Sequence, residues 1–253
     1  MKSAIQVSRL AERVAALRIS SDEHPYLDGA TAPALAEAVA ALRADETVHA
    51  VLITGGERHF CAGVARETLL ADDGAAALSE LLAQVPRLLL SIPVPTVAAM
   101  AGHAIGGGFL LGLWCDLAFL AEESLYGVNP ISLGFTPGMG ALQVLEEALG
   151  SPLARELMFT GRIRKGRELG GSLLHGILPR KDVFAGALAA AQEIAEAPRE
   201  ALTLLKSAVA ERRREGLEKA LLREESMHRL LFARPETKRL ISERYAVAKE
   251  VDP

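Results

Sequence analysis

Hydrophobic residues alternate along the chain between short runs of strand length and longer segments with helical spacing, from the N-terminus to about residue 180. Residues 48–54 form an apolar run that ends at a pair of glycines, and residues 96–100 form another, so both are predicted to be buried strands. Residues 78–90 repeat apolar positions at helical spacing until Pro93 and Pro95 interrupt them. This alternation predicts an α/β fold of stacked ββα or βαβ units with mostly buried strands.

Further elements of the core follow from the same pattern. Residues 31–43 are predicted to be a helix, with Thr31 as its N-cap and Pro33 in its first turn. Strand-length runs occur within residues 5–19 and at 117–120, a loop is expected at 60–63, and helices are expected through residue 70 and from the glycines near 106 to residue 114.

The pattern changes after about residue 180, where the remaining sequence is helical throughout. Helices are expected at residues 183–196, 199–214, 217–234 and 237–250. We therefore divide the chain at a soft boundary near residue 195, with an α/β core over residues 1–195 and a C-terminal helical region over residues 196–253.

Composition narrows the class of protein. Half of the 253 residues are hydrophobic, 4% are aromatic and the net charge is −4, so a packed aliphatic core is expected and a nucleic-acid partner is not. Cys61 and Cys115 stand in apolar surroundings without metal-ligand spacing and are predicted to be buried, reduced thiols. Neither a signal peptide nor an apolar run of membrane-spanning length is evident, so we expect a soluble, cytoplasmic protein without a membrane partner.

A glycine triplet, Gly106–Gly108, follows the strand predicted at residues 96–100 and begins the next helix. Glycine loses the most backbone entropy on folding, so three in succession indicate a need for bare backbone. One interpretation is a helix N-terminus whose free N–H groups point at an anion or a developing oxyanion. The other is close packing of a helix on a strand without any ligand. The spacing does not match the dinucleotide-binding fingerprint.

A second turn with small residues follows the strand predicted at residues 48–54. It contains Ala62, Gly63 and Val64. Two such turns from adjacent strands would aim two backbone N–H groups at one point, which is the geometry of an oxyanion hole.

These two turns, together with residues 126–130 and 134–140, resemble those of the crotonase (enoyl-CoA hydratase/isomerase) superfamily, and the similarity extends from about residue 11 to residue 245. The resemblance implies a spiral of ββα units, a C-terminal helical region used for trimerisation, and a homotrimer or a hexamer made as a dimer of trimers. It also implies that the N–H groups of Val64 and Gly107 hold a thioester oxygen. The residues that it places along the substrate are Ala62, Gly63, Gly106, Leu110, Tyr126, Pro130, Phe135 and Met139, with core packing as the alternative for Tyr126.

Two departures from the family pattern bear on the chemistry. Leu110 and Pro130 stand where hydratases of the family carry the two glutamates that activate water, and neither side chain can transfer a proton. Asn129 lies near the second position but is not a base. Hydration by the usual mechanism is therefore not expected.

The chain resembles more closely one branch of the superfamily, the decarboxylases of polyketide β-branching that act on 3-methylglutaconyl groups carried by an acyl carrier protein (ACP). The matching segments are residues 102–109, residues 134–140 and the pair Met227-His228. In that branch a late His and a Lys face the substrate. The His corresponds to His228, whereas residues 67–97 contain no lysine and offer Gln84 and Arg87.

The resemblance implies decarboxylation of a 3-methylglutaconyl-type thioester to a 3-methylcrotonyl-type thioester. Val64 and Gly107 would stabilise the dienolate, and His228 would return the proton. Without the resemblance, the position of His228 in a leucine-rich helix favours a surface or inter-subunit histidine. The substrate would be carried on the phosphopantetheine of ACP or on coenzyme A, with no metal or redox cofactor.

Two other functions stay open on the sequence. A crotonase-fold isomerase would use His228 to move a proton between carbons of an enoyl thioester. A non-catalytic member would bind an acyl thioester without turning it over.

Overall fold

Two sheets organise the fold, and the computed structural model describes residues 5–71, 74–170 and 174–245. The larger sheet has the strand order β1-β2-β3-β5-β7-β10, and its strands are β1 (Gln6–Ala11), β2 (Val14–Arg18), β3 (Ala50–Thr54), β5 (Thr96–Met100), β7 (Leu117–Ala121) and β10 (Gly176–Leu178). β1 and β2 form an antiparallel hairpin, and every other pairing in this sheet is parallel. Parallel strands are usually buried on both faces, in agreement with the apolar runs of the sequence.

The smaller sheet has the order β4-β6-β8-β9, with strands β4 (His59–Cys61), β6 (His103–Ile105), β8 (Leu125–Gly127) and β9 (Ile163–Lys165). Along the chain, each of β3, β5 and β7 is followed by a strand of the smaller sheet and then by helical structure. This repeat is the predicted ββα unit. It brings the loops that follow β4, β6 and β8 to one edge of the molecule.

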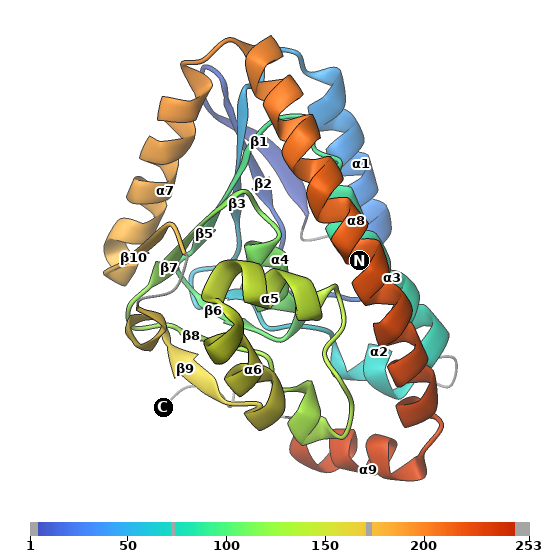
Figure 1. The fold of residues 1–253 in the computed structure, drawn as a ribbon. Coiled ribbons are helices and arrows are strands. Elements are labelled where there is room, and N and C mark those ends of the chain that lie inside the picture. The colour runs from blue at the N-terminus through green and yellow to red at the C-terminus, as the bar shows by residue number, and fades with distance from the viewer. Residues whose placement is uncertain (1–4, 72–73, 171–173, 246–253) are drawn as a thin grey trace.

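Nine α-helices surround the sheets in the described residues (Figure 1). They are α1 (Thr31–Ala44), α2 (Arg66–Leu70), α3 (Gly74–Leu90), α4 (Gly107–Leu113), α5 (Ala141–Leu149), α6 (Ser151–Thr160), α7 (Arg180–Ala195), α8 (Arg199–Phe232) and α9 (Pro235–Arg244), with 3-10 turns at Pro130–Leu133 and Gly166–Leu169. α7 packs its alanine-rich face on β3, β5 and β7, whereas α8 crosses the molecule and packs on α3 and α5. No helix in the described ranges is long and apolar enough to cross a membrane.

A buried ion pair joins α8 to the larger sheet. Nζ of Lys206 donates to the two carboxylate oxygens of Asp116 at 2.9 and 2.7 Å, and the side chain of Lys206 is only 2% exposed. Asp116 also accepts the N–H of Thr96 at 2.7 Å, at the start of β5. Removing one member of such a pair would leave the other buried without compensation, so the pair fixes where α8 crosses the core.

Several sequence predictions differ from the structure in detail. Residues 199–214 and 217–234 were expected to be two helices, but α8 is continuous because a single glycine lowers helix stability without ending a helix. The side-chain amide oxygen of Gln143 lies 2.2 Å from the position that a Cβ on Gly216 would occupy. The loop expected at residues 60–63 begins later, because β4 pairs in parallel with β6.

Thr31 is the first residue of α1 rather than its N-cap, which is Ala30. Its hydroxyl is already engaged with the preceding turn, where it accepts the N–H of Asp28 at 2.8 Å. The predicted final helix is α9, and residues 246–250 of that prediction lie outside the described residues. Cys61 and Cys115 are free, buried thiols, as predicted.

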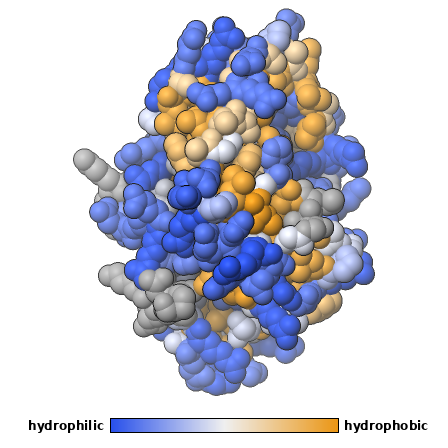
Figure 2. Space-filling view, turned by 90° about the vertical axis from the view of Figure 1, so that its left-hand side faces the viewer, coloured by the Kyte–Doolittle hydropathy of each residue, from blue (hydrophilic) through white to orange (hydrophobic). Residues whose placement is uncertain are grey.

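Apolar side chains also reach the surface. Figure 2 shows them gathered over the upper half and the centre of one face, bordered by hydrophilic side chains. On α8, Leu204 and Leu205 are 67% and 65% exposed, and Leu205 lines a hollow of about 600 Å³ next to the Lys206–Asp116 pair.

Candidate functional site

The two small-residue turns predicted from the sequence lie side by side. β4 and β6 are parallel neighbours, with Cys61 opposite Ala104, so the chain leaves both strands in the same direction. A Cβ built on Gly63 would lie 3.7 Å from the backbone nitrogen of Gly107. The parallel register of two three-residue strands is therefore what brings the two loops together.

The glycine triplet combines close packing with a sharp turn at the start of α4. Gly108 packs so closely on β4 that a Cβ there would lie 2.1 Å from the carbonyl oxygen of Cys61. Gly106 adopts φ +55° and ψ −125°, a backbone conformation that residues other than glycine rarely adopt. Close packing at Gly108 and the turn at Gly106 together leave Gly107 as the first residue of α4.

Backbone N–H groups of Val64 and Gly107 are the predicted oxyanion donors. Gly107 opens a helix, so its N–H has no acceptor within that helix. Bonds between Leu27 and the residues on either side of Val64 turn the N–H of Val64 away from Leu27. Within the described residues, neither nitrogen donates a hydrogen bond. Both residues line the same cavity.

That cavity has a volume of about 60 Å³ and lies at the start of α4. Besides the two donors, it is lined by six of the predicted substrate-contacting residues: Ala62, Gly63, Gly106, Leu110, Pro130 and Phe135. No carboxylate belongs to its described lining, in which Asn129 and Tyr245 supply the polar side chains. Leu110 and Pro130 thus place apolar surface beside the donors, as their replacement of the family's glutamates predicts.

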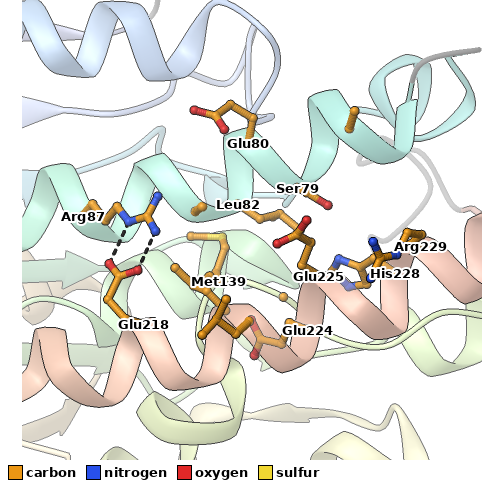
Figure 3. Close-up of a pocket in the computed structure, with 15 residues that line it drawn as sticks. Ser79, Glu80, Leu82, Arg87, Met139, Glu218, Glu224, Glu225, His228 and Arg229 are labelled. Carbon is orange, nitrogen blue, oxygen red and sulfur yellow. Dashed lines mark hydrogen bonds and ion pairs between the residues drawn. The ribbon is translucent and has the colours of Figure 1, made fainter.

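A larger cavity of about 410 Å³ adjoins the first between α3 and α8 (Figure 3). Leu82 and Gly138 line both cavities, so they form the partition between them. Its charged lining residues are Glu80, Arg87, Glu218, Glu224, Glu225 and Arg229. Carboxylates are therefore absent from the described lining next to the oxyanion donors but present in the adjoining cavity.

His228 lines the larger cavity rather than the smaller one. Its side chain is buried, and Nε2 donates a hydrogen bond to the carbonyl oxygen of Thr136 at 2.8 Å, since a carbonyl can only accept. Burial lowers the pKa of His228, and hydrogen bonds to the backbone of Thr136 and Pro137 partly oppose that effect. The ring stands edge-on to Phe135 and Phe232, with centroid distances of 6.2 and 6.0 Å. The packing fixes the ring close to the partition at Gly138, where its Cε1 lies 2.9 Å from the position of a Cβ.

Glu224 is a buried acid that the sequence reasoning missed. It lies one helical turn before His228 on α8, lines the larger cavity and is 1% exposed. Its carboxylate accepts the N–H groups of Gly140 at 2.8 Å and Leu142 at 3.4 Å, at the N-terminus of α5. Burial raises its pKa to about 7 against those hydrogen bonds. The four-residue spacing from His228 was the available signal, because it places both side chains on one helix face.

Met139 also lies in the larger cavity and connects it to the oxyanion donors. Its backbone has φ +61°, and its carbonyl oxygen accepts the indole N–H of Trp114 at 2.6 Å. A Cβ on Gly107 would lie 3.0 Å from the sulfur of Met139. Met139 therefore packs against one of the two donors, in keeping with its predicted place along the substrate.

Tyr126 was predicted to line the substrate or to pack in the core, and the structure supports packing. The ring is fully buried, and the hydroxyl donates to the carbonyl of Met100 at 2.5 Å while it accepts the N–H of Ala121 at 2.8 Å. The two backbone groups occupy the hydroxyl, and Tyr126 lines neither cavity. The structure therefore favours the packing alternative for Tyr126, and its contact with the substrate stays a prediction.

The two side chains considered in place of the branch's lysine, Arg87 and Gln84, are both engaged in other contacts. Arg87 makes a two-point ion pair with Glu218 at 2.8 and 2.5 Å across the larger cavity (Figure 3). Gln84 donates to Glu80. Tyr245, which the sequence did not indicate, lines the small cavity and donates its hydroxyl to the carbonyl of Val64 at 2.7 Å. This bond fixes the orientation of the peptide between Val64 and Ala65, in the loop that follows β4.

Comparison with known proteins gives a consistent result. A family model described as enoyl-CoA hydratase/isomerase matches residues 12–246. The bacillaene synthase decarboxylase PksI of Bacillus subtilis is 35% identical over 213 residues, which cover 83% of this chain and 85% of that protein.

Two solved structures are also similar. One belongs to a dehydratase/decarboxylase enzyme couple involved in polyketide β-branching, with a TM-score of 0.86, 30% identity and 96% coverage of both chains. The other is the ECH2 decarboxylase domain of CurF from Lyngbya majuscula, with a TM-score of 0.84, 28% identity and coverage of 96% of this chain and 99% of that one.

Proposed function

Because the chain belongs to the enoyl-CoA hydratase/isomerase family and its relatives above are decarboxylases, it is a decarboxylase, and we propose that it acts on a 3-methylglutaconyl-type thioester in polyketide β-branching. One observation carries the proposal. The N–H groups of Val64 and Gly107 lie free at a cavity whose described lining contains no carboxylate. Such a cavity can hold an enolate oxygen while it lacks the acids that hydration requires.

The chemistry begins with the thioester oxygen between Val64 and Gly107. The bond between the carboxylate carbon and the adjacent methylene breaks, CO2 leaves, and the electron pair moves through the double bond onto the thioester oxygen. Each backbone donor to the resulting dienolate contributes about 3–4 kcal/mol of transition-state stabilisation. The apolar surface of Leu110 disfavours the charged carboxylate relative to neutral CO2.

Protonation of the terminal carbon completes the reaction and yields the 3-methylcrotonyl-type thioester. One proton is consumed for each CO2 released. His228 in its protonated form is the proposed donor, and the ring regains its proton from solvent through the larger cavity. The hydrogen bond from Nε2 to Thr136 orients the ring for this transfer.

The carrier and the assembly belong to the same proposal. The cavity between α3 and α8, at about 410 Å³, offers space for the acyl group and the phosphopantetheine arm of ACP or coenzyme A. We propose a trimer, or a dimer of trimers, formed through residues 196–253, supported by the exposed leucines 204 and 205 of α8. Sedimentation velocity of the purified protein tests the assembly, and we propose a cytoplasmic location.

Incubation with 3-methylglutaconyl thioesters of ACP and of coenzyme A, followed by mass spectrometry in deuterated water, tests the function. We expect loss of the mass of CO2 and uptake of one deuterium, with the preferred carrier giving the faster reaction. His228→Ala should remove most of the activity, whereas the exposed His175→Ala serves as the matched control.

Other outcomes point to the alternatives. Exchange of deuterium into an enoyl thioester without loss of CO2 would identify an isomerase. Binding of acyl-pantetheine with neither reaction would identify a non-catalytic member, and either result would refute the decarboxylase.

A further inference from the structure

The turn over residues 136–140 connects the wall of both cavities to α5. Met139, within it, has φ +61° and is the one residue other than glycine with positive φ in the described part of the chain. A bulky side chain in this conformation persists only where the surrounding structure holds it in place. The contacts of this turn therefore decide where the Met139 side chain points.

Three hydrogen bonds from other elements hold the turn. Nε2 of His228 donates to the carbonyl of Thr136 at 2.8 Å, and the indole of Trp114 donates to the carbonyl of Met139 at 2.6 Å. The N–H of Gly140 donates to the carboxylate of Glu224 at 2.8 Å. Glu224 thus binds the peptide that directly follows Met139.

Met139 connects the hydrogen-bonded turn over residues 136–140 to Gly107, the proposed oxyanion donor. Its sulfur lies 3.0 Å from where a Cβ on Gly107 would stand, and its side chain lies between α3 and α8 beside Glu224 (Figure 3). Since protein interiors are close-packed, moving Met139 changes the space around the N–H of Gly107. A continuous set of contacts therefore leads from Glu224 through Gly140 and Met139 to Gly107.

We propose that Glu224 is a positioning residue that, by accepting the N–H of Gly140, holds Met139 against Gly107 and so sets the geometry of the oxyanion hole. This role rests on the proposed decarboxylation, and it assigns Glu224 no contact with the substrate. The required property is a hydrogen-bond acceptor at the carboxylate position, which a glutamine retains and a leucine lacks.

Steady-state kinetics of three variants test the role. Glu224→Leu should lower kcat by about 10²-fold with KM changed less than about threefold, comparable to the loss of one oxyanion donor. Glu224→Gln should restore kcat to within about fivefold of the wild type, because the amide oxygen still accepts the N–H of Gly140. Glu215→Leu is the matched control, since its exposed side chain lies on the same helix and lines neither cavity, and it should leave kcat unchanged.

A second measurement does not depend on activity. In protein labelled with [methyl-13C]methionine, which has five methionines, the signal of Met139 is assigned by its loss in Met139→Leu. It should shift in Glu224→Leu and keep its position in Glu224→Gln and Glu215→Leu. If Glu224→Leu does not fold by circular dichroism, Glu224→Ala replaces it.

A wild-type kcat or an unmoved Met139 signal in Glu224→Leu would overturn the role. Equal losses of kcat in Glu224→Gln and Glu224→Leu would also overturn it, because the charge or proton of Glu224 would then matter rather than its hydrogen bond. If the wild type releases no CO2 but the Met139 signal still shifts as expected, the proposed function fails while the structural link from Glu224 to Met139 stands.

Discussion

His228 and Thr136 are joined by a hydrogen bond of 2.8 Å, from Nε2 of the ring to the backbone carbonyl. This bond ties α8 to the turn that forms the partition between the two cavities. It also fixes the proton of the neutral ring on Nε2, so the proton needed for the reaction is taken up at Nδ1. His228 is thus held both as a structural contact of the turn and as a candidate acid.

The first prediction concerns the pH dependence of turnover. Burial lowers the pKa of His228 below its ordinary value of 6.5, and the proposed donor is the protonated ring. We expect kcat to fall about tenfold per pH unit above that pKa, and His228→Gln to lower kcat by about 10²–10⁴-fold. Rates measured from pH 5 to 9 check this. A flat profile in the wild type would speak against His228 as the acid.

The second prediction links Glu224 to stability. Its pKa rises from 4.5 to about 7 on folding, so the folded state favours the protonated form. The corresponding stabilisation is full below pH 4.5 and is lost as pH rises through about 7, a total of about 3 kcal/mol. Glutamine does not titrate, so Glu224→Gln should gain stability relative to the wild type between pH 4.5 and 8.

Urea unfolding of both proteins at several pH values measures this difference. Titration of the other groups, His228 included, is to first order common to both proteins and cancels in the comparison. A difference in unfolding free energy that stays constant from acid to neutral pH would show that Glu224 is not perturbed on folding.

The third prediction separates two adjacent glycines. Alanine at Gly108 would place its Cβ 2.1 Å from the backbone oxygen of Cys61, which cannot move without β4. We expect Gly108→Ala to lose at least about 3 kcal/mol of stability. At Gly107 the nearest atoms are the ends of the flexible side chains of Met139 and Leu27, at 3.0 and 3.2 Å. Gly107→Ala should therefore fold.

For Gly107→Ala, unlike Gly108→Ala, the main expected loss is of activity rather than of stability. Gly107→Ala displaces Met139 beside the oxyanion donor, so we expect kcat to fall about tenfold or more with stability lowered by less than about 1 kcal/mol. Urea unfolding and kcat are compared for both variants. Similar losses of stability at the two positions would contradict the described packing.

The fourth prediction concerns the effect of introducing a negative charge at Leu110, which is buried in the small cavity. Leu110→Glu and Leu110→Gln introduce side chains of the same size, and only the first can carry a negative charge. Repulsion of the substrate carboxylate should make decarboxylation at least about tenfold slower in Leu110→Glu than in Leu110→Gln at pH 8. The gap should close in acid, where the new carboxyl is protonated. Equal rates at every pH would argue that carboxylates are tolerated beside the donors.

The sequence indicated the two small-residue turns of the candidate oxyanion hole because their requirements are local. Gly106 and Gly108 are imposed by a turn and by one close backbone contact, and both constraints appear directly as residue types. That the two loops lie together was predicted, whereas the pairing of β4 with β6 that brings them together was not, because residues 60–63 were expected to be a loop. The fold class and the proximity of the loops that carry Val64 and Gly107 were accordingly within reach of sequence reasoning.

Features that depend on contacts between distant segments could not be predicted from the sequence. Glu224 binds Gly140 and Tyr245 binds Val64, and in each pair the partners are separated by more than 80 residues. The burial of Glu224 depends on α3 and α5 packing against α8. Its spacing from His228 indicates a shared helix face but not which elements cover that face. Likewise, the occupied hydroxyl of Tyr126 follows from the neighbouring strands rather than from its motif.

The continuity of α8 has one more consequence. Arg213 donates to the carbonyls of Leu113, Trp114 and Cys115 at the end of α4, so α8 holds that helix at its C-terminus as well as the turn that packs on its N-terminus. Arg213, Glu224 and His228 lie on one face because 11 and 4 residues are close to whole numbers of helical turns. A single residue inserted between Arg213 and Glu224 would rotate the latter by about 100° and advance it by about 1.5 Å. The length of α8 between Arg213 and His228 therefore fixes how the two ends of α4 are held relative to each other.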